Sequence, residues 1–166
     1  MAAPVSIDTA SVVYNFLKTD ADGADVRALL ASGASSVIEA GLVNASTIQT
    51  AYTARLALTP SGVGKALIII VRDAGEVPEG PGMSTETVAI DILDIGQGYR
   101  NIRGVQQKLR KVLLQPHVVN VVANGDAVRG ILQLTFGGRT GHRFDETFSV
   151  EFETIVFQAQ VETEWL

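Results

Sequence analysis

The stretch 99–114, YRNIRGVQQKLRKVLL, constrains the fold most strongly because its apolar residues recur with the period of an amphipathic helix. At about 100° per residue, one arc of such a helix carries Ile102, Val105, Leu109, Val112 and Leu113. Basic side chains gather roughly opposite this arc, namely Arg100, Arg103, Lys108, Arg110 and Lys111. The sequence therefore predicts a helix with one side packed on an apolar surface and a cationic stripe on the other.

This cationic stripe contrasts with the rest of the chain. No Asp or Glu lies within 99–114, whereas the whole chain carries a formal net charge of −5 at pH 7. The acidic total argues against a dedicated nucleic-acid binder, for which a basic domain is typical. A solvated helix face also tolerates lysine and arginine. The segregation of five cations nevertheless favours a contact surface, either for self-association by charge complementarity or for lining a passage for DNA.

Length and composition bound the class of protein. The 166 residues predict one domain, and an apolar fraction of 46% with only 6% aromatics predicts an aliphatic core. The absence of cysteine excludes disulfides, thiolate metal sites and cysteine nucleophiles. The longest apolar run, Ala66 to Val71, is too short to span a bilayer, and the N-terminus has no secretory pattern. We therefore expect a soluble protein that does not associate with membranes.

The first half of the chain predicts helices followed by a hairpin. Residues 6–33 are expected to be helical, with Ser6 or Asp8 as the first cap. Residues 35–58 fit neither helical nor strand periodicity, and show weak strand character near 36–39 and 52–58. A hairpin is expected over 65–95, formed by the aliphatic strand 66–71, a loop rich in glycine and proline over 73–82, and a strand over 85–95. The uninterrupted apolar run predicts a first strand that is covered on both faces.

The C-terminal part, 117–163, predicts a β-meander. Asn124-Gly125 is a strong hairpin signal between strands at 118–123 and 128–136, and a long final strand follows from Phe148. In that strand apolar residues alternate with acids, which predicts an acidic edge or face with candidate contacts at Glu151, Glu153, Glu162 and Glu164. The basic helix and this acidic strand are expected to pair within one subunit or between subunits. The predicted fold class is α+β, a mainly antiparallel sheet with helices packed on one face.

The sequence offers little for catalysis or metal binding. His142 lies near Asp145 but has no metal-ligand spacing. The run Gly62-Val63-Gly64-Lys65 lacks the glycine spacing of a phosphate loop and leads into a strand. Acid pairs such as Asp91 with Asp94, or Glu151 with Glu153, are read as solvated positions on strands. We therefore expect no catalytic, metal or cofactor site, and a protein that is not an enzyme.

The run 66–114 resembles the middle of the tail terminator proteins of long-tailed bacteriophages, also called tail-completion or head–tail joining proteins. Its features are the apolar strand at 67–71, a hairpin loop at 74–83, a second strand at 88–95 and a helix that starts at a conspicuous tyrosine, Tyr99. A leading helix around 11–17 and the C-terminal meander extend the resemblance over most of the chain.

The resemblance implies a structural protein without cofactor. It would form a homo-oligomeric ring, typically of six subunits, that caps the tail tube, ends tube growth and provides the head-docking surface. Its partners would be the tail-tube protein, a head-completion or connector protein, and DNA that passes without sequence recognition. It would be found at the head-proximal end of the virion tail, and in the host cytoplasm during assembly.

The alternatives are another head–tail connector or tail-tube subunit, or a small non-enzymatic binding domain. The hairpin loop is the candidate partner contact, through Glu76, Val77, Pro78, Glu79, Pro81 and Met83.

Overall fold

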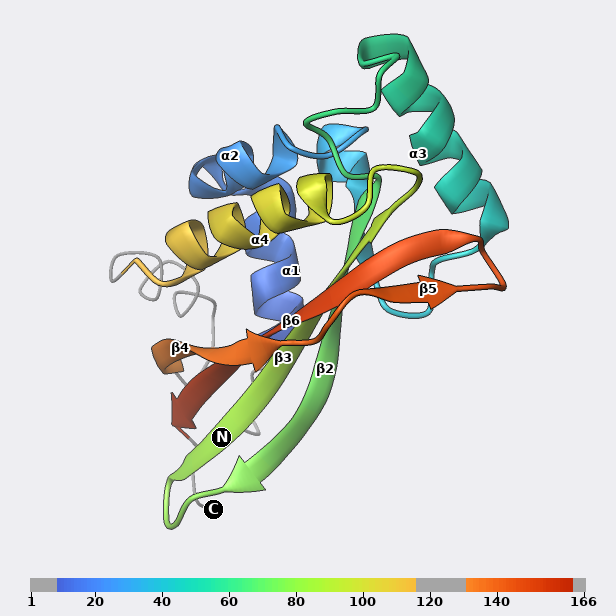
Figure 1. The fold of residues 1–166 in the computed structure, drawn as a ribbon. Coiled ribbons are helices and arrows are strands. Elements are labelled where there is room, and N and C mark those ends of the chain that lie inside the picture. Colours follow the sequence, from blue (N-terminus) through green and yellow to red (C-terminus); the bar gives the residue numbers. More distant parts are fainter. Residues whose placement is uncertain (1–8, 116–130, 163–166) are drawn as a thin grey trace.

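The computed structural model describes residues 9–115 and 131–162, which form four α-helices and a six-stranded sheet (Figure 1). The helices are α1 (Thr9–Thr19), α2 (Ala24–Arg27), α3 (Ala45–Leu58) and α4 (Arg100–Leu113). The strands are β1 (Val37–Glu39), β2 (Ile68–Pro78), β3 (Met83–Asp94), β4 (Ile131–Arg139), β5 (Arg143–Asp145) and β6 (Val150–Glu162). This is the expected α+β fold, with a series of strands at its C-terminal end.

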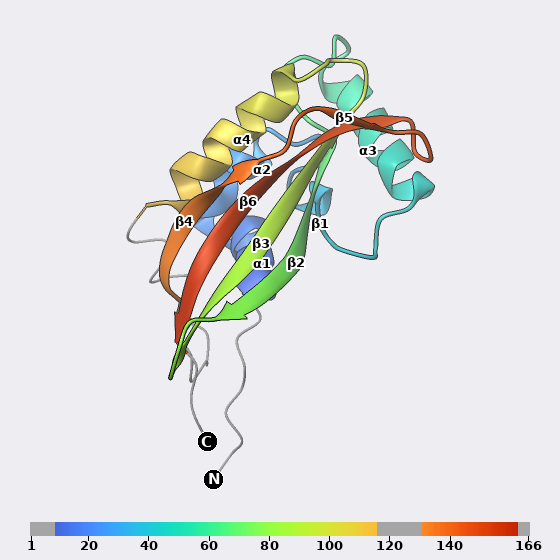
Figure 2. The same ribbon diagram turned by 60° about the horizontal axis from the view of Figure 1, so that its bottom comes forward.

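The strands follow the order β1-β2-β3-β6-β4, and β5 pairs with β6 beyond the end of β4 (Figure 2). Only β1 and β2 run parallel, and the other neighbours are antiparallel. The long C-terminal strand β6 is therefore flanked by β3 and β4 along most of its length. The expectation of an acidic edge at this strand is wrong, because β6 lies inside the sheet.

The larger core lies on one face of the sheet, under α1, α2 and α4. Successive strand residues point to opposite faces, so Ile69 and Val71 of β2 reach this core while Ile68 and Ile70 face the other side. Helix α1 contributes its apolar side, including Val13, which is 1% exposed. The expected coverage of the first strand on both faces is confirmed at this end of β2.

A second, smaller core lies on the opposite face, where α3 packs at one end of the sheet. Ile48 and Ala51 of α3 join Ile68 and Leu93 there. The helices thus cover both faces of the sheet, whereas the sequence predicted them on one face only. Beyond this end, the same face carries polar side chains, including Thr85, Gln133, Thr135, Gln158 and Gln160, which line a shallow hollow.

The least patterned part of the sequence, 35–58, contains one correct and one wrong prediction. The strand near 36–39 is confirmed as β1, whereas residues 52–58 belong to α3 and not to a strand. Asn44 caps α3 by accepting a hydrogen bond from the Thr47 amide at 3.0 Å. The helix lacks a clear apolar stripe because only a few of its side chains reach the core, and Leu56 and Leu58 remain 43% and 63% exposed.

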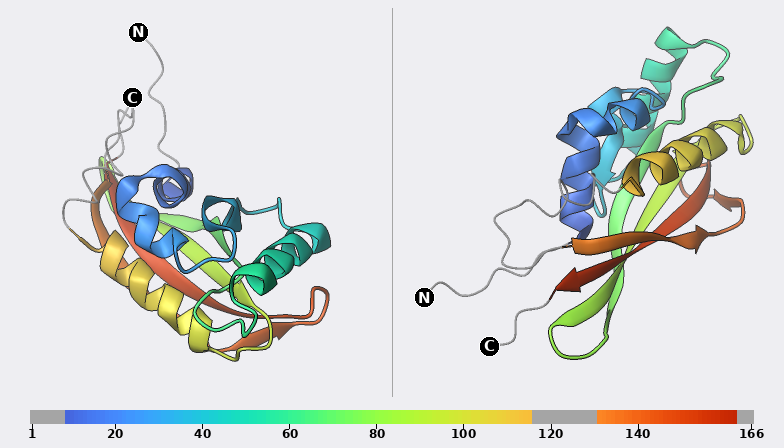
Figure 3. Two further views of the ribbon diagram at one scale, coloured as in Figure 1. Left: turned by 90° about the horizontal axis from the view of Figure 1, so that it is seen from above. Right: turned by 90° about the vertical axis from the view of Figure 1, so that its left-hand side faces the viewer.

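The β2–β3 hairpin is longer than expected, because β2 continues through the predicted loop as far as Pro78. We call residues 73–83 the hairpin arm, which extends past the helices (Figures 1 and 3). A register shift between Asp73 and Glu76 interrupts its ladder, and Gly75 takes a φ of 119° there. Strand β1 pairs with β2 only at residues 69–71, so no described strand covers the outer edge of the arm.

Several sequence predictions fall outside the described residues. These are the caps Ser6 and Asp8, the strand expected at 118–123 and the Asn124-Gly125 turn. The strand expected at 128–136 is described only from residue 131, as the start of β4.

Candidate assembly surfaces

Helix α4 forms as its sequence predicts. Two glycines with positive φ, Gly96 at 72° and Gly98 at 59°, turn the chain from β3 into the helix. All five predicted apolar residues are at most 6% exposed: Ile102, Val105, Leu109, Val112 and Leu113. The opposite side of the helix is therefore available to solvent or to a partner.

Two of the five basic residues of α4 contact side chains of the sheet. The Nε of Arg103 lies 3.4 Å from Oε2 of Glu153 in β6, and its guanidinium stands 5.5 Å from the ring centre of Tyr99. The Arg110 guanidinium stacks 4.0 Å from the ring centre of Phe136 in β4. These contacts turn that flank of α4 toward β6 and β4, the side of the sheet farthest from β1.

The other three cations make no ion pair with any described residue. Arg100 and Lys111 are exposed and Lys108 is half-buried. On a helical projection, Arg100 and Lys111 lie within about 20° of each other, at the crown of the exposed side. We call Arg100, Lys108 and Lys111 the helix crown.

Glu153 has a different role from the one its sequence pattern predicted. Its side chain is 0% exposed and binds two arginines, Arg103 and, at 2.9 Å, Nη1 of Arg139. The interpretation of Glu153 as a solvated position is wrong, because it shares the helix-covered face of β6 with Ile155 and Phe157. A buried carboxylate is strongly unfavourable without such partners. The expected pairing of basic helix and acidic strand thus occurs within one subunit at this position.

The remaining residues of the predicted acidic face lie apart. Glu151 is 24% exposed at its side chain, and its Oε1 lies 3.7 Å from Nε2 of His142, whose ring packs edge-on against Tyr99. Glu162 is the last residue of β6, and Glu164 lies outside the described residues. Glu151 and Glu153 thus have different partners and different exposure, and do not form one acidic surface.

The predicted partner loop is the hairpin arm. Glu76, Val77 and Pro78 belong to β2, Glu79 and Pro81 lie in the turn, and Met83 begins β3. Residues 73–81 are all exposed, and Val77 in particular is 62% exposed. Exposed connections that project from a rigid scaffold commonly carry contacts with partners.

The sequence did not predict a buried polar network at the other end of β3. Asp94 forms a salt bridge with Arg55 of α3, and it accepts a hydrogen bond from Nδ2 of Asn101 in α4 at 2.9 Å. Arg55 also donates to the carbonyls of Lys65 and Ile95, at 3.2 and 2.9 Å. The network joins α3, β3 and α4, so Asp94 is a structural residue and not a solvated one.

Burial raises the pKa of Asp94 above its ordinary value of 3.8. Desolvation of the charged form is the largest cause, and it is opposed by the Arg55 charge and by hydrogen bonds from Ile95 and Asn101. Asp91 lies on the other face of β3, where it binds Arg72 and the Thr154 hydroxyl. The acid pair Asp91 and Asp94 therefore does not share a site.

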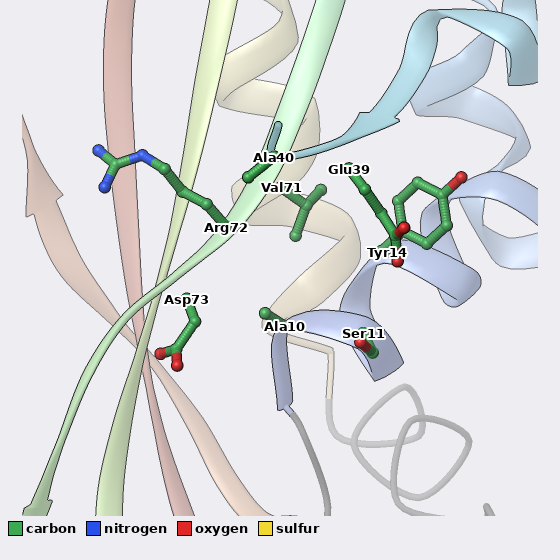
Figure 4. A pocket seen from close by; sticks show the side chains of 8 residues that line it. All are labelled: Ala10, Ser11, Tyr14, Glu39, Ala40, Val71, Arg72 and Asp73. Carbon is green, nitrogen blue, oxygen red and sulfur yellow. The ribbon is translucent and has the colours of Figure 1, made fainter. Parts of the chain in front are cut away.

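A pocket of about 160 Å³ lies where β1 ends against β2, beside α1 (Figure 4). Glu39 and Asp73 are its acidic residues, and Ser11 and Tyr14 of α1 contribute to its wall. The Arg72 side chain points away from the other labelled residues, consistent with its pairing to Asp91 at 2.9 Å. The pocket therefore presents an acidic opening at this edge of the sheet.

Neither a metal cluster nor a membrane span is found among the described residues. No group of three or more His, Asp or Glu side chains in 9–115 and 131–162 is arranged to hold a metal ion. No helix of these residues has the length and apolar character needed to cross a bilayer.

Known proteins that resemble this chain are found among solved structures. A scan against models of protein families gives no match, and neither does a search of curated proteins. Among solved structures, the chain is similar to one from the "Virion of native gene transfer agent (GTA) particle". The TM-score is 0.40 with 16% sequence identity, over 57% of this chain and 69% of the other.

Proposed function

We propose that this protein is a structural virion protein that closes into a ring on the tail tube of a long-tailed phage. The ring, of six subunits, ends tube growth and offers the surface on which the head docks. In this role the protein needs no cofactor and is not an enzyme. It acts at the head-proximal end of the tail, after assembly in the host cytoplasm.

The observation that carries this proposal is the separation of two exposed features on one rigid sheet. The helix crown lies over the β6–β4 side, while the hairpin arm projects from β2 and β3. A ring subunit needs contacts to its neighbours and, separately, to the structures above and below it. The sequence resemblance over 66–114 supports the same role. The proposed partners are the tail-tube protein and a head-completion or connector protein, while DNA passes through the ring without sequence recognition.

The proposal is tested first by native mass. Light scattering of the purified protein should reveal a discrete closed oligomer, and mixing with tail-tube protein should give tubes that stop growing and carry one added layer at an end by electron microscopy. A protein that itself polymerises into long tubes would instead be a tail-tube subunit. A monomer that leaves tube growth unchanged would contradict the proposal.

A further inference from the structure

The edge of the sheet formed by β1 and β2 is acidic where it is open. Glu39 ends β1, Asp73 lies two residues beyond Val71, the last β2 residue that pairs with β1, and Glu79 lies in the turn of the hairpin arm. All three residues are exposed. We call them the acidic edge, and two of them flank the pocket shown in Figure 4.

The helix crown lies toward the opposite edge of the same sheet. In the strand order β1-β2-β3-β6-β4, Arg103 binds β6 and Arg110 stacks on β4, which turns α4 away from the β1 side. One subunit thus carries a positive face on the β6–β4 side of the sheet and a negative face on the β1–β2 side. Arg100 and Lys111 form no ion pair with any residue that the structure describes, and their charge is complementary to that of the acidic edge of another subunit.

We propose that the helix crown of one copy of this chain docks on the acidic edge of a second copy, head to tail. This inference rests on the proposed function and identifies the two faces that close the ring. A symmetric contact of either face with itself would oppose like charges, which is costly, whereas the head-to-tail contact opposes unlike charges. Repetition of one head-to-tail contact produces a ring when its rotation closes.

The pocket at the acidic edge fits a long cationic side chain. Its lining combines Ala10, Ala40 and Val71 with the acidic residues Glu39 and Asp73. The guanidinium of Arg72, which also lines the pocket, is paired with Asp91. Lysine and arginine bury an aliphatic stem on such a surface while their charged ends meet carboxylates. This assignment replaces the C-terminal acids as the complementary face, because Glu153 already binds Arg103 and Arg139 within its own subunit.

Charge reversal on one face at a time tests the contact. The edge variant carries Glu39→Lys and Glu79→Lys, which leaves Asp73 in its hydrogen bond to the Gly75 amide. The crown variant carries Arg100→Glu and Lys111→Glu. Each variant alone should associate at least tenfold more weakly than the wild type in light scattering. An equimolar mixture should regain the oligomer, because each altered face meets an oppositely charged face of the other variant.

A matched control carries Asp25→Lys and Glu146→Lys, which changes net charge as much as the edge variant does. Both positions are exposed and belong to neither face. This control should assemble like the wild type, and circular dichroism should show that all variants remain folded.

Several results would overturn the inference. They are a wild type that stays monomeric at every concentration, variants that assemble normally, or a mixture that does not recover. Loss of binding to duplex DNA by a crown variant that still assembles would reassign the crown to nucleic acid. If the variants behave as expected but the wild type does not cap tubes, the proposed function fails and the contact stands. If tubes are capped regardless of these charges, the proposed function stands and this contact fails.

Discussion

Strand β2 has two halves that belong to different kinds of structure. Residues 68–71 lie between two cores, with Ile68 and Ile69 at most 1% exposed, while residues 73–78 are exposed throughout. The first half is adjacent to the buried Arg55–Asp94 network, because Ile68 pairs with Leu93 just before Asp94. The residues that stabilise the fold and those that offer a contact surface are therefore separated along a single strand. Changes in the first half should therefore unfold the protein, and changes in the second should affect only what it contacts.

The largest expected effect is at the buried network. Arg55→Met should destabilise the fold by about 3–5 kcal/mol, because it leaves Asp94 as a buried charge without its cation. Urea unfolding measures this change. Arg72→Met is the control, because the Arg72–Asp91 pair is partly exposed and should contribute about 1 kcal/mol or less. Equal effects of the two substitutions would show that burial does not distinguish the pairs.

The next largest loss of stability is expected from a substitution in the buried half of β2. Ile69→Ala removes a side chain that is 0% exposed in the larger core, and should cost about 2–5 kcal/mol. Thermal unfolding followed by circular dichroism measures it. A loss below about 1 kcal/mol would mean that the first half of β2 does not carry the core.

The pH dependence of stability tests how burial affects Asp94. Because the folded protein raises the pKa of Asp94 above 3.8, the folded state holds this proton more tightly than the unfolded state does. The Asp94 contribution to stability should be greatest below the unfolded pKa and fall as pH rises through the folded pKa, by at most about 1.4 kcal/mol per pH unit. Unfolding free energies of wild type and Asp94→Asn are compared from pH 3.5 upward, on the order of one reading per half unit. Parallel curves would contradict this assignment.

The smallest expected effect on stability is in the second half of β2. Val77→Ser changes a side chain that is 62% exposed, so the free energy of unfolding should move by about 0.5 kcal/mol or less. If the hairpin arm contacts a partner, the same variant should still lose capping of tail tubes in electron microscopy. Thr53→Ala, at an exposed position of α3, serves as a control that should change neither property. A strongly destabilised Val77 variant would show that the arm belongs to the core.

The sequence predicted those elements whose pattern reflects a single buried face. Helix α4 is such a case, because its apolar spacing corresponds to its contacts. The start of β2 was predicted from a different signal, a continuous apolar run, because both of its faces are buried. Helix α3 was missed because it buries few side chains, Ile48, Ala51 and Arg55, which leave no apolar period. Charge patterns predicted the basic side of α4. They did not predict which of its cations contact the sheet and which form no ion pair with a described residue.

The acidic residues of β6 were also assigned to the wrong environment from their sequence pattern. Glu153 alternates with Phe152 as a solvent-facing residue would. Both faces of β6 are covered near its start, so alternation alone does not show which side faces solvent. The Arg55–Asp94–Asn101 network joins residues 39 and 7 positions apart, which no local pattern reveals. Likewise, the acidic edge unites Glu39 with Asp73 only through the parallel pairing of β1 and β2.

The outer edge of the hairpin arm bears on how readily the protein aggregates. An uncovered strand edge presents free amide and carbonyl groups and invites pairing with any extended chain. Here the edge is interrupted by the bulge at Gly75, carries Asp73 and Glu79 near its two ends, and stops at Pro78, which has no amide hydrogen to donate. Such an edge resists fibre formation while leaving its side chains exposed. We therefore expect that the protein does not aggregate through this strand at high concentration.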